Sequence, residues 1–336
     1  MGKRFFVLIL SLIVFLLFFT GTFLFKENFI SFFQSEKWFF TSLKERQGKI
    51  EEKIILLAVG DIMLDRGVEY MVLKEGGGDY FFPFSEIASY LQKGDILFGN
   101  LESVISDKGE NVGGPYPFRA EPAAIRGLTS AGFDVLSVAN NHLFDYGRKA
   151  MEDSLKRLKE AGIDYVGAGF SLNEARGPVI KKVGQTKIAF FAYTNLGPKS
   201  WQAEEKKSGI VWLDESFEED IRRAKGTNDL VIVSFHFGDE YQAKPNASQE
   251  LWARKAIDAG ADLVVGHHPH VVQPLEKYKE GYIAYSLGNF VFDQSFSEET
   301  MKGRLLEVVI ENVEIKEVIP REIMINKFFQ PQKPIL

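Results

Sequence analysis

The sequence has no cysteine among its 336 residues, which excludes disulfide bonds, thiolate metal sites and cysteine nucleophiles. It also has no excess of basic residues, because the formal net charge is -6 and the isoelectric point is about 5.6. Binding to a nucleic-acid backbone needs a basic face, so nucleic acid is not expected as a partner. With thiolates absent, any metal ion must be held by His, Asp, Glu or Asn side chains, which suit manganese, zinc or iron.

A long segment without charged residues stands near the start of the chain, at residues 5–25. As a helix it would span a bilayer core of about 30 Å. Lys3 and Arg4 precede it, so the positive-inside rule places the N-terminus in the cytoplasm and the following domain outside the cell. A cleaved signal peptide is the alternative, but its apolar region usually has about 7–15 residues. We therefore predict an uncleaved anchor at residues 1–25 and a single-pass protein of the cell membrane.

Residues 26–52 combine charges with several Phe side chains and Trp38, and they form a predicted juxtamembrane stalk. Such aromatic residues favour the membrane interface, where the stalk would lie as an amphipathic helix. A tether whose aromatic side chains pack on the following domain fits the same residues equally well. We assign residues 53–320 to one domain and residues 321–336 to a C-terminal tail.

Short apolar runs alternate with helical patterns and predict an α/β fold with a largely parallel sheet. The predicted helices are residues 151–161 and 249–259, each followed by glycine. After residue 305 we expect an edge strand or hairpin and a tail that contains proline. The predicted strands are residues 54–59, 96–98, 135–138, 188–193, 230–235, 263–265 and 283–286.

The five histidines of the chain all follow predicted strands, in three short motifs. His142 ends Asn-Asn-His, His236 stands in Ser-Phe-His-Phe-Gly, and the other three lie in His-His-Pro-His at residues 267–270. Histidine is the commonest metal ligand and acid–base catalyst among side chains near neutral pH. In open α/β sheets the ligand crevice lies outside the carboxyl ends of the strands. The pattern therefore predicts one metal or catalytic site built from loops that follow several strands.

Carboxylate and amide side chains follow the predicted strands in the same way. Asp61 and Glu102 come after the first two strands, Asn141 precedes His142, and Asn289 follows the last strand. Taken alone, Asp61 could hold a turn, Glu102 could be a solvated loop acid, and Asn-Asn-His could be a turn with a buried, hydrogen-bonded histidine. Together they are the oxygen and nitrogen ligands that a divalent cation takes when thiolates are absent.

Seven motifs of the chain match a known family and keep its order. The motifs are Val-Gly-Asp-Ile-Met-Leu (59–64), Gly-Asn-Leu-Glu (99–102), Ala-Gly-Phe-Asp-Val-Leu-Ser-Val-Ala-Asn-Asn-His-Leu-Phe-Asp-Tyr-Gly (131–147), Ala-Gly-Ile (161–163), His236 with Gly238, Ala-Asp-Leu-Val-Val-Gly-His-His-Pro-His-Val-Val-Gln-Pro (261–274) and Tyr-Ser-Leu-Gly-Asn-Phe-Val-Phe-Asp (285–293). In these motifs the sequence resembles the bacterial capsule synthesis (CapA or poly-γ-glutamate biosynthesis) proteins, a group within the calcineurin-like metallophosphoesterase superfamily. The similarity extends over about residues 54–295.

The resemblance implies a four-layer α/β/β/α sandwich with two sheets, preceded by one N-terminal transmembrane helix. It also implies that Asn141 binds a second metal ion and that His142 protonates the leaving group. The superfamily begins with Asp-x-His, but Met63 replaces that histidine here, which removes one ligand and puts ordinary phosphatase activity in question. The implied ligands of one or two divalent ions (manganese, zinc or iron) are Asp61, Glu102, Asn141, His236, His268 and His270.

The expected function is the synthesis or export of an anionic capsule polymer, poly-γ-glutamate, by a membrane-anchored, extracytoplasmic protein. A metal-dependent hydrolase or transferase would use His142 as general acid, oriented by Asp145. The expected partners are the polymer, the membrane and other membrane subunits of a capsule complex. Two alternatives stay open, which are a non-enzymatic polymer-binding scaffold and a generic extracellular phosphodiesterase. The candidate substrate-binding residues are Arg119, for which an ordinary surface role is at least as good, Glu240 and Asn289.

Overall fold

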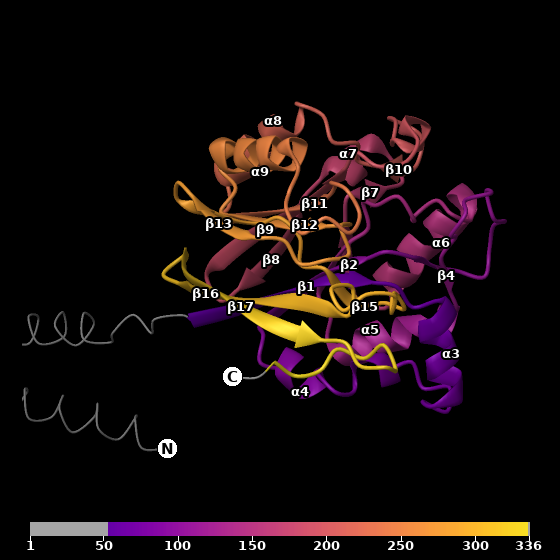
Figure 1. The fold of residues 1–336 in the computed structure, drawn as a ribbon. Helices are drawn as coiled ribbons and strands as arrows, with labels where there is room; N and C mark the ends of the chain where they lie inside the picture. The colour runs from indigo at the N-terminus through magenta and orange to yellow at the C-terminus, as the bar shows by residue number, and fades with distance from the viewer. Residues whose placement is uncertain (1–52, 335–336) are drawn as a thin grey trace, which may run out of the picture. The chain divides into compact units, whose positions relative to one another are not determined.

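The computed structural model describes residues 53–334, and the predicted anchor and stalk lie outside these described residues. Two β-sheets with helices on their outer faces make up the domain (Figure 1). Within residues 53–334, no helix is both long and apolar enough to cross a membrane.

The first sheet has seven strands, with a parallel centre and an antiparallel edge. Four strands, β1, β2, β5 and β6, run parallel, and β15 pairs in parallel with the end of β1. The other two strands form the antiparallel hairpin that was predicted after residue 305. The strands of this sheet are β1 (Lys53–Ile62), β2 (Ile96–Leu101), β5 (Val135–Ser137), β6 (Asp164–Val166), β15 (Asn289–Val291), β16 (Lys302–Glu311) and β17 (Glu314–Met324).

The second sheet has six strands, with four parallel strands between two antiparallel edge strands. Its strands are β8 (Val179–Val183), β9 (Thr186–Thr194), β11 (Leu230–His236), β12 (Leu263–His267), β13 (Leu275–Tyr278) and β14 (Gly281–Ala284). Two short pairs lie beside the main sheets, β3 (Val104–Ile105) with β4 (Arg119–Ala120), and β7 (Ala168–Gly169) with β10 (Gly209–Ile210).

Three apolar cores hold the four layers together. Between the sheets, Phe98 of β2 stacks on Phe190 of β9 with ring centroids 5.6 Å apart. Helices α3 to α6 cover the outer face of the first sheet and α7 to α9 that of the second (Figure 1). The predicted α/β fold is therefore confirmed, and its layers run α/β/β/α. The helices are α3 (Arg66–Lys74), α4 (Ala88–Leu91), α5 (Ile125–Ala131), α6 (Gly147–Glu160), α7 (Leu172–Arg176), α8 (Phe217–Lys225) and α9 (Ala247–Ala259), with short 3-10 turns η1 (Phe82–Phe84), η2 (Pro122–Ala124) and η3 (Lys199–Trp201).

Helix α9 begins at Ala247, ahead of the predicted start at residue 249, because its first turn is capped. The side chain of Asn246 accepts from the backbone of Gln249, and the side chain of Gln249 accepts from the backbone of Asn246. This reciprocal capping box satisfies backbone donors that would otherwise lack partners.

Near the C-terminus, strand β17 continues past residue 320, where we predicted that the domain ends and the tail begins.

The carboxyl ends of the parallel strands in both sheets meet at one place. A close backbone contact holds the end of β1 there. The backbone N–H of Asp61, at the end of β1, donates to the carbonyl of Gly288 at 3.0 Å. A Cβ atom on Gly60 would lie 1.9 Å from that carbonyl oxygen, so only glycine fits there. The contact fixes Asp61 beside the loops that carry the histidines.

Candidate metal and catalytic site

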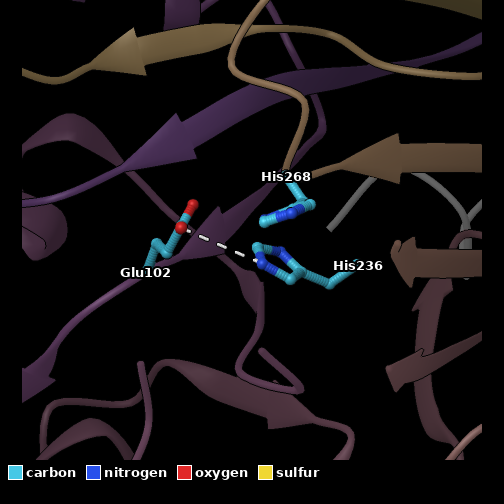
Figure 2. A group of neighbouring side chains, drawn as sticks. All are labelled: Glu102, His236 and His268. Atoms are coloured by element: carbon cyan, nitrogen blue, oxygen red, sulfur yellow. Dashed lines mark ion pairs between the residues drawn. The ribbon is translucent and has the colours of Figure 1, made fainter. Parts of the chain in front are cut away.

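Glu102, just after β2, lies at the centre of the site. Its Oε1 is 3.6 Å from Nε2 of His270, 3.7 Å from Nε2 of His142 and 3.9 Å from Nε2 of His236. Figure 2 shows Glu102 pointing toward His236 and His268, which come from the second sheet. Burial, and then the nearby negative charge of Asp61, raises the pKa of Glu102 well above its usual range.

Asp61 joins the first sheet to the loop after β12. Its Oδ1 accepts from Nδ2 of Asn100 at 2.8 Å and lies 3.2 Å from Nδ1 of His267. Its Oδ2 accepts from the backbone N–H of His268 at 3.2 Å and lies 3.5 Å from Nδ1 of His270. Burial alone would raise the pKa of Asp61, but His267 and His270 beside it lower the pKa overall.

Three imidazoles of the site, those of His236, His268 and His270, have lowered pKa values, which favours their neutral form. Burial lowers the pKa of His236 well below its usual range, and neighbouring imidazoles lower it further. Burial and then His270 lower the pKa of His268 to about 3. Both His268 and His270 have positive φ angles, 96° and 57°, which non-glycine residues rarely adopt outside functional sites. A neutral imidazole keeps a ring nitrogen free as a metal ligand.

These side chains fit a divalent cation. Glu102 Oε1 and His268 Nδ1 are buried and have no hydrogen-bond partner within residues 53–334. A buried carboxylate without a partner is costly, and a cation would supply the missing partner. Three groups have ligand atoms within 4.8 Å of one another, and Glu102 belongs to two of them. The groups are Glu102 with His236 and His268, Asp61 with Glu102 and His270, and Glu240 with His268 and His270.

Comparison with known proteins identifies the family of this chain, and the matched region contains the site motifs. The family model described as "Bacterial capsule synthesis protein PGA_cap" matches residues 55–294. The chain belongs to this family. The capsule biosynthesis protein CapA of Bacillus anthracis is 38% identical over 255 residues, which cover 73% of this chain and 61% of the relative. The PGA biosynthesis protein CapA of Bacillus subtilis is 37% identical over 243 residues, covering 71% and 63% respectively. The matched part thus spans about three-fifths of either relative.

A solved structure has a similar fold. A novel phosphatase from Mycoplasma pneumoniae superposes with a TM-score of 0.50 at 14% identity, covering 85% of this chain and 96% of the phosphatase. At that identity the similarity shows the fold alone. The resemblance to the capsule synthesis family is confirmed, and the described domain has the fold of this phosphatase.

His142 and Asp145 form a pair at the edge of the cluster, in the loop between β5 and α6. Nδ1 of His142 donates to Oδ2 of Asp145 at 2.7 Å, so Nε2 is the nitrogen that faces Glu102. The ring of Phe118 stacks on His142 with centroids 4.0 Å apart, and its backbone N–H donates to the same Asp145 oxygen at 2.8 Å. The imidazole is therefore held from two sides in one orientation.

The other candidate residues occupy different positions around the cluster. Asn141 lies within it, because its Oδ1 is 2.7 Å from Nε2 of His236. Glu240 is exposed and completes one group of possible ligands. Asn289 is fully buried, and its Oδ1 is hydrogen-bonded to Nδ1 of His270 at 3.0 Å. This hydrogen bond orients His270. The amide nitrogen of Asn289 donates to Gln294 and to the Thr300 carbonyl. The substrate-binding role of Asn289 stays a prediction. Arg119 is half-buried beside the His142 loop.

One supporting residue, Asn100, was not identified from the sequence. Asn100 donates to Asp61 and lies 3.3 Å from Nδ1 of His236, which leaves Nε2 of His236 for the cluster. Its position in Gly-Asn-Leu-Glu, two residues before Glu102, was the available signal. Met63, which replaces a ligand histidine of the superfamily, is fully buried in the core between the first sheet and its helices.

Proposed function

We propose that this capsule synthesis protein acts outside the cytoplasm, anchored to the cell membrane, on an anionic polymer in its synthesis or export. The polymer would be poly-γ-glutamate, with other membrane subunits as partners. The descriptions of the two Bacillus relatives as capsule and PGA biosynthesis proteins support this choice. The observation that carries a catalytic role is the oriented His142, whose Nε2 faces the ligand cluster at 3.7 Å from Glu102.

The proposed centre holds one or two divalent ions, manganese, zinc or iron. The chemistry that such an ion supplies when bound is Lewis acidity toward the scissile group and a lowered pKa for a bound water. His142 would donate the proton on Nε2 to the leaving group, and Asp145 would hold Nδ1 and stabilise the charged imidazole. The proposed ligands are Asp61, Glu102, Asn141, His236, His268 and His270.

The membrane orientation gives the first test. Lys3 and Arg4 precede an apolar segment, so we expect the domain after residue 25 to lie outside. Protease added to intact cells stripped of their wall should digest that domain while a cytoplasmic marker protein stays whole. Complete protection of the domain would contradict both the orientation and the extracytoplasmic role.

The ligand cluster gives the second test. A ligand that binds only the native state stabilises it by about 2.7 kcal/mol at a hundredfold excess over its dissociation constant. Chelator should therefore lower the melting temperature of the purified full-length chain. His268→Ala should weaken this effect, whereas Glu86→Gln, at an exposed position between η1 and α4, should not. No metal in elemental analysis and no change with chelator would contradict the metal centre.

One observation favours a second candidate function, a non-enzymatic scaffold that holds the polymer for membrane partners. The buried Met63 supplies a core side chain where the superfamily supplies a ligand, so the first ion would have one ligand fewer. Metal content separates the two proposals, because the scaffold does not need an ion.

A further inference from the structure

We propose that two arginines beside the His142 loop, Arg119 and Arg148, bind successive carboxylates of an extended polyanion, so that the site holds a strand of polymer. A third, Arg66, lies in the same group and is paired with Asp293. The inference rests on the proposed function and names how its polymer is recognised. We call Arg66, Arg119 and Arg148 the arginine cluster. All three are half-buried.

Each guanidinium of the arginine cluster lies over an aromatic ring. Contact between the flat face of the guanidinium and the ring fixes the position of the cation. The N–H groups around the edge of the guanidinium can then bind carboxylate oxygens, which match its fork geometry. Those of Arg66 already bind Asp293. The pairs, with the distance from Cζ to the ring centroid, are Arg66 with Phe118 (4.6 Å), Arg119 with Tyr146 (4.1 Å) and Arg148 with Phe144 (5.1 Å).

The three rings belong to the surroundings of the proposed catalytic pair. Phe118 stacks on His142 and donates its backbone N–H to Asp145. Phe144 and Tyr146 are the chain neighbours of Asp145. The three cations therefore lie along the loop that carries His142, where β4 and the start of α6 come together.

The charges of Arg119 and Arg148 are not neutralised by an ion pair. No hydrogen bond or ion pair joins the guanidinium of Arg119 to any other residue in the described range 53–334. The guanidinium of Arg148 donates to Oγ of Ser208 at 3.3 Å and forms no ion pair within residues 53–334. Lys207 and then the nearby charge of Arg148 lower the pKa of the Glu204 carboxyl. Two half-buried cations thus lack an ion-pair partner among residues 53–334, on a protein whose net charge is -6.

Arg66 lies at the end of the arginine cluster toward the metal ligands. Its guanidinium pairs with Asp293, and its positive charge opposes the effect of burial on the pKa of Glu102. Asp65 uses both carboxylate oxygens on backbone N–H groups, those of Arg66 and Arg119, at 2.7 Å each. Asp65 therefore fixes the backbone that carries two of the arginines.

A repeating polyanion fits this arrangement better than a small phosphoester. One anionic group at the ligand cluster would leave the arginines beside the His142 loop without a partner. A net negative protein repels a polyanion in general, so a local group of unpaired cations is what attracts and orients one. Charge complementarity thus favours a chain of carboxylates as the occupant.

The test measures binding of fluorescently labelled poly-γ-glutamate to the full-length chain in mild detergent, at several salt concentrations. The double variant Arg119→Gln with Arg148→Gln should bind about tenfold more weakly, which is about 1.4 kcal/mol. It should also show a smaller loss of affinity with added salt, because fewer ionic contacts are screened. The corresponding Lys double variant should recover part of the affinity. Arg222→Gln, on α8 over the second sheet, is the matched control and should bind like the wild type.

Three other results would overturn either the inference or the proposed function. Equal polymer affinity of the wild type and the Gln double variant would overturn the inference and leave the proposed function standing. An equal loss of affinity for phenyl phosphate and for the polymer would also overturn it, because the arginines would then serve a small anion. A wild-type chain that binds no polymer but hydrolyses simple phosphoesters would overturn the proposed function itself. Unchanged melting temperatures of the variants exclude misfolding as the cause of weaker binding.

Discussion

In a His142→Ala variant, we expect turnover to fall by about 10²–10⁴-fold while bound metal stays near the wild-type level. Nδ1 of His142 is bonded to Asp145, and Nε2 faces the ligand cluster, so the residue is placed to transfer a proton. Losing a proton donor slows the departure of the leaving group but removes none of the proposed metal ligands. Elemental analysis of the purified protein measures metal, and capsule formation in cells measures function.

Two variants serve as comparisons for His142→Ala. His270→Ala should lose both metal and function, since His270 belongs to two groups of candidate ligands. Asp145→Asn should give an intermediate loss of function, because the imidazole stays but loses its charged partner. Normal capsule from His142→Ala, expressed at the wild-type level, would contradict a catalytic role and favour the scaffold.

The strands were predictable from the sequence because their signal is local. Short apolar runs between Gly, Asn and Asp mark buried parallel strands, and seven such runs coincide with strands of the structure. The division into two sheets was not visible in that pattern. A buried strand has the same apolar sequence pattern in either sheet, so only the resemblance to a family predicted the two-sheet architecture.

The ligand cluster was predictable because it lies at strand ends, where chain position and spatial position coincide. The direction in which each side chain points could not be predicted from the sequence. Asn289 follows a strand as expected, yet its amide is buried and bonds to His270. Arg66 comes two residues after the first motif in the chain, but its contact with Phe118 joins segments that no local pattern links. Such contacts depend on packing between distant residues.

A Glu102→Gln variant should lose metal binding and function, and its metal-free form should be more stable than the metal-free wild type. Oε1 of Glu102 is fully buried, and no described residue from 53 to 334 forms a hydrogen bond with it. Glutamine has the same shape without the acidic group, and its amide can donate to the imidazole nitrogens nearby. Removing an unsatisfied buried group of this kind stabilises a protein by about 1–3 kcal/mol.

Thermal melting with chelator and with added manganese measures both effects of Glu102→Gln. In chelator the variant should melt at a higher temperature than the wild type. With manganese the wild type should gain stability and Glu102→Gln should not, because Glu102 belongs to two groups of candidate ligands and its charge is needed in both. Glu86→Gln, at an exposed position, should behave like the wild type in both conditions. A variant that still gains stability from manganese would show that Glu102 is not the shared ligand, and the ions would then have to be held without it.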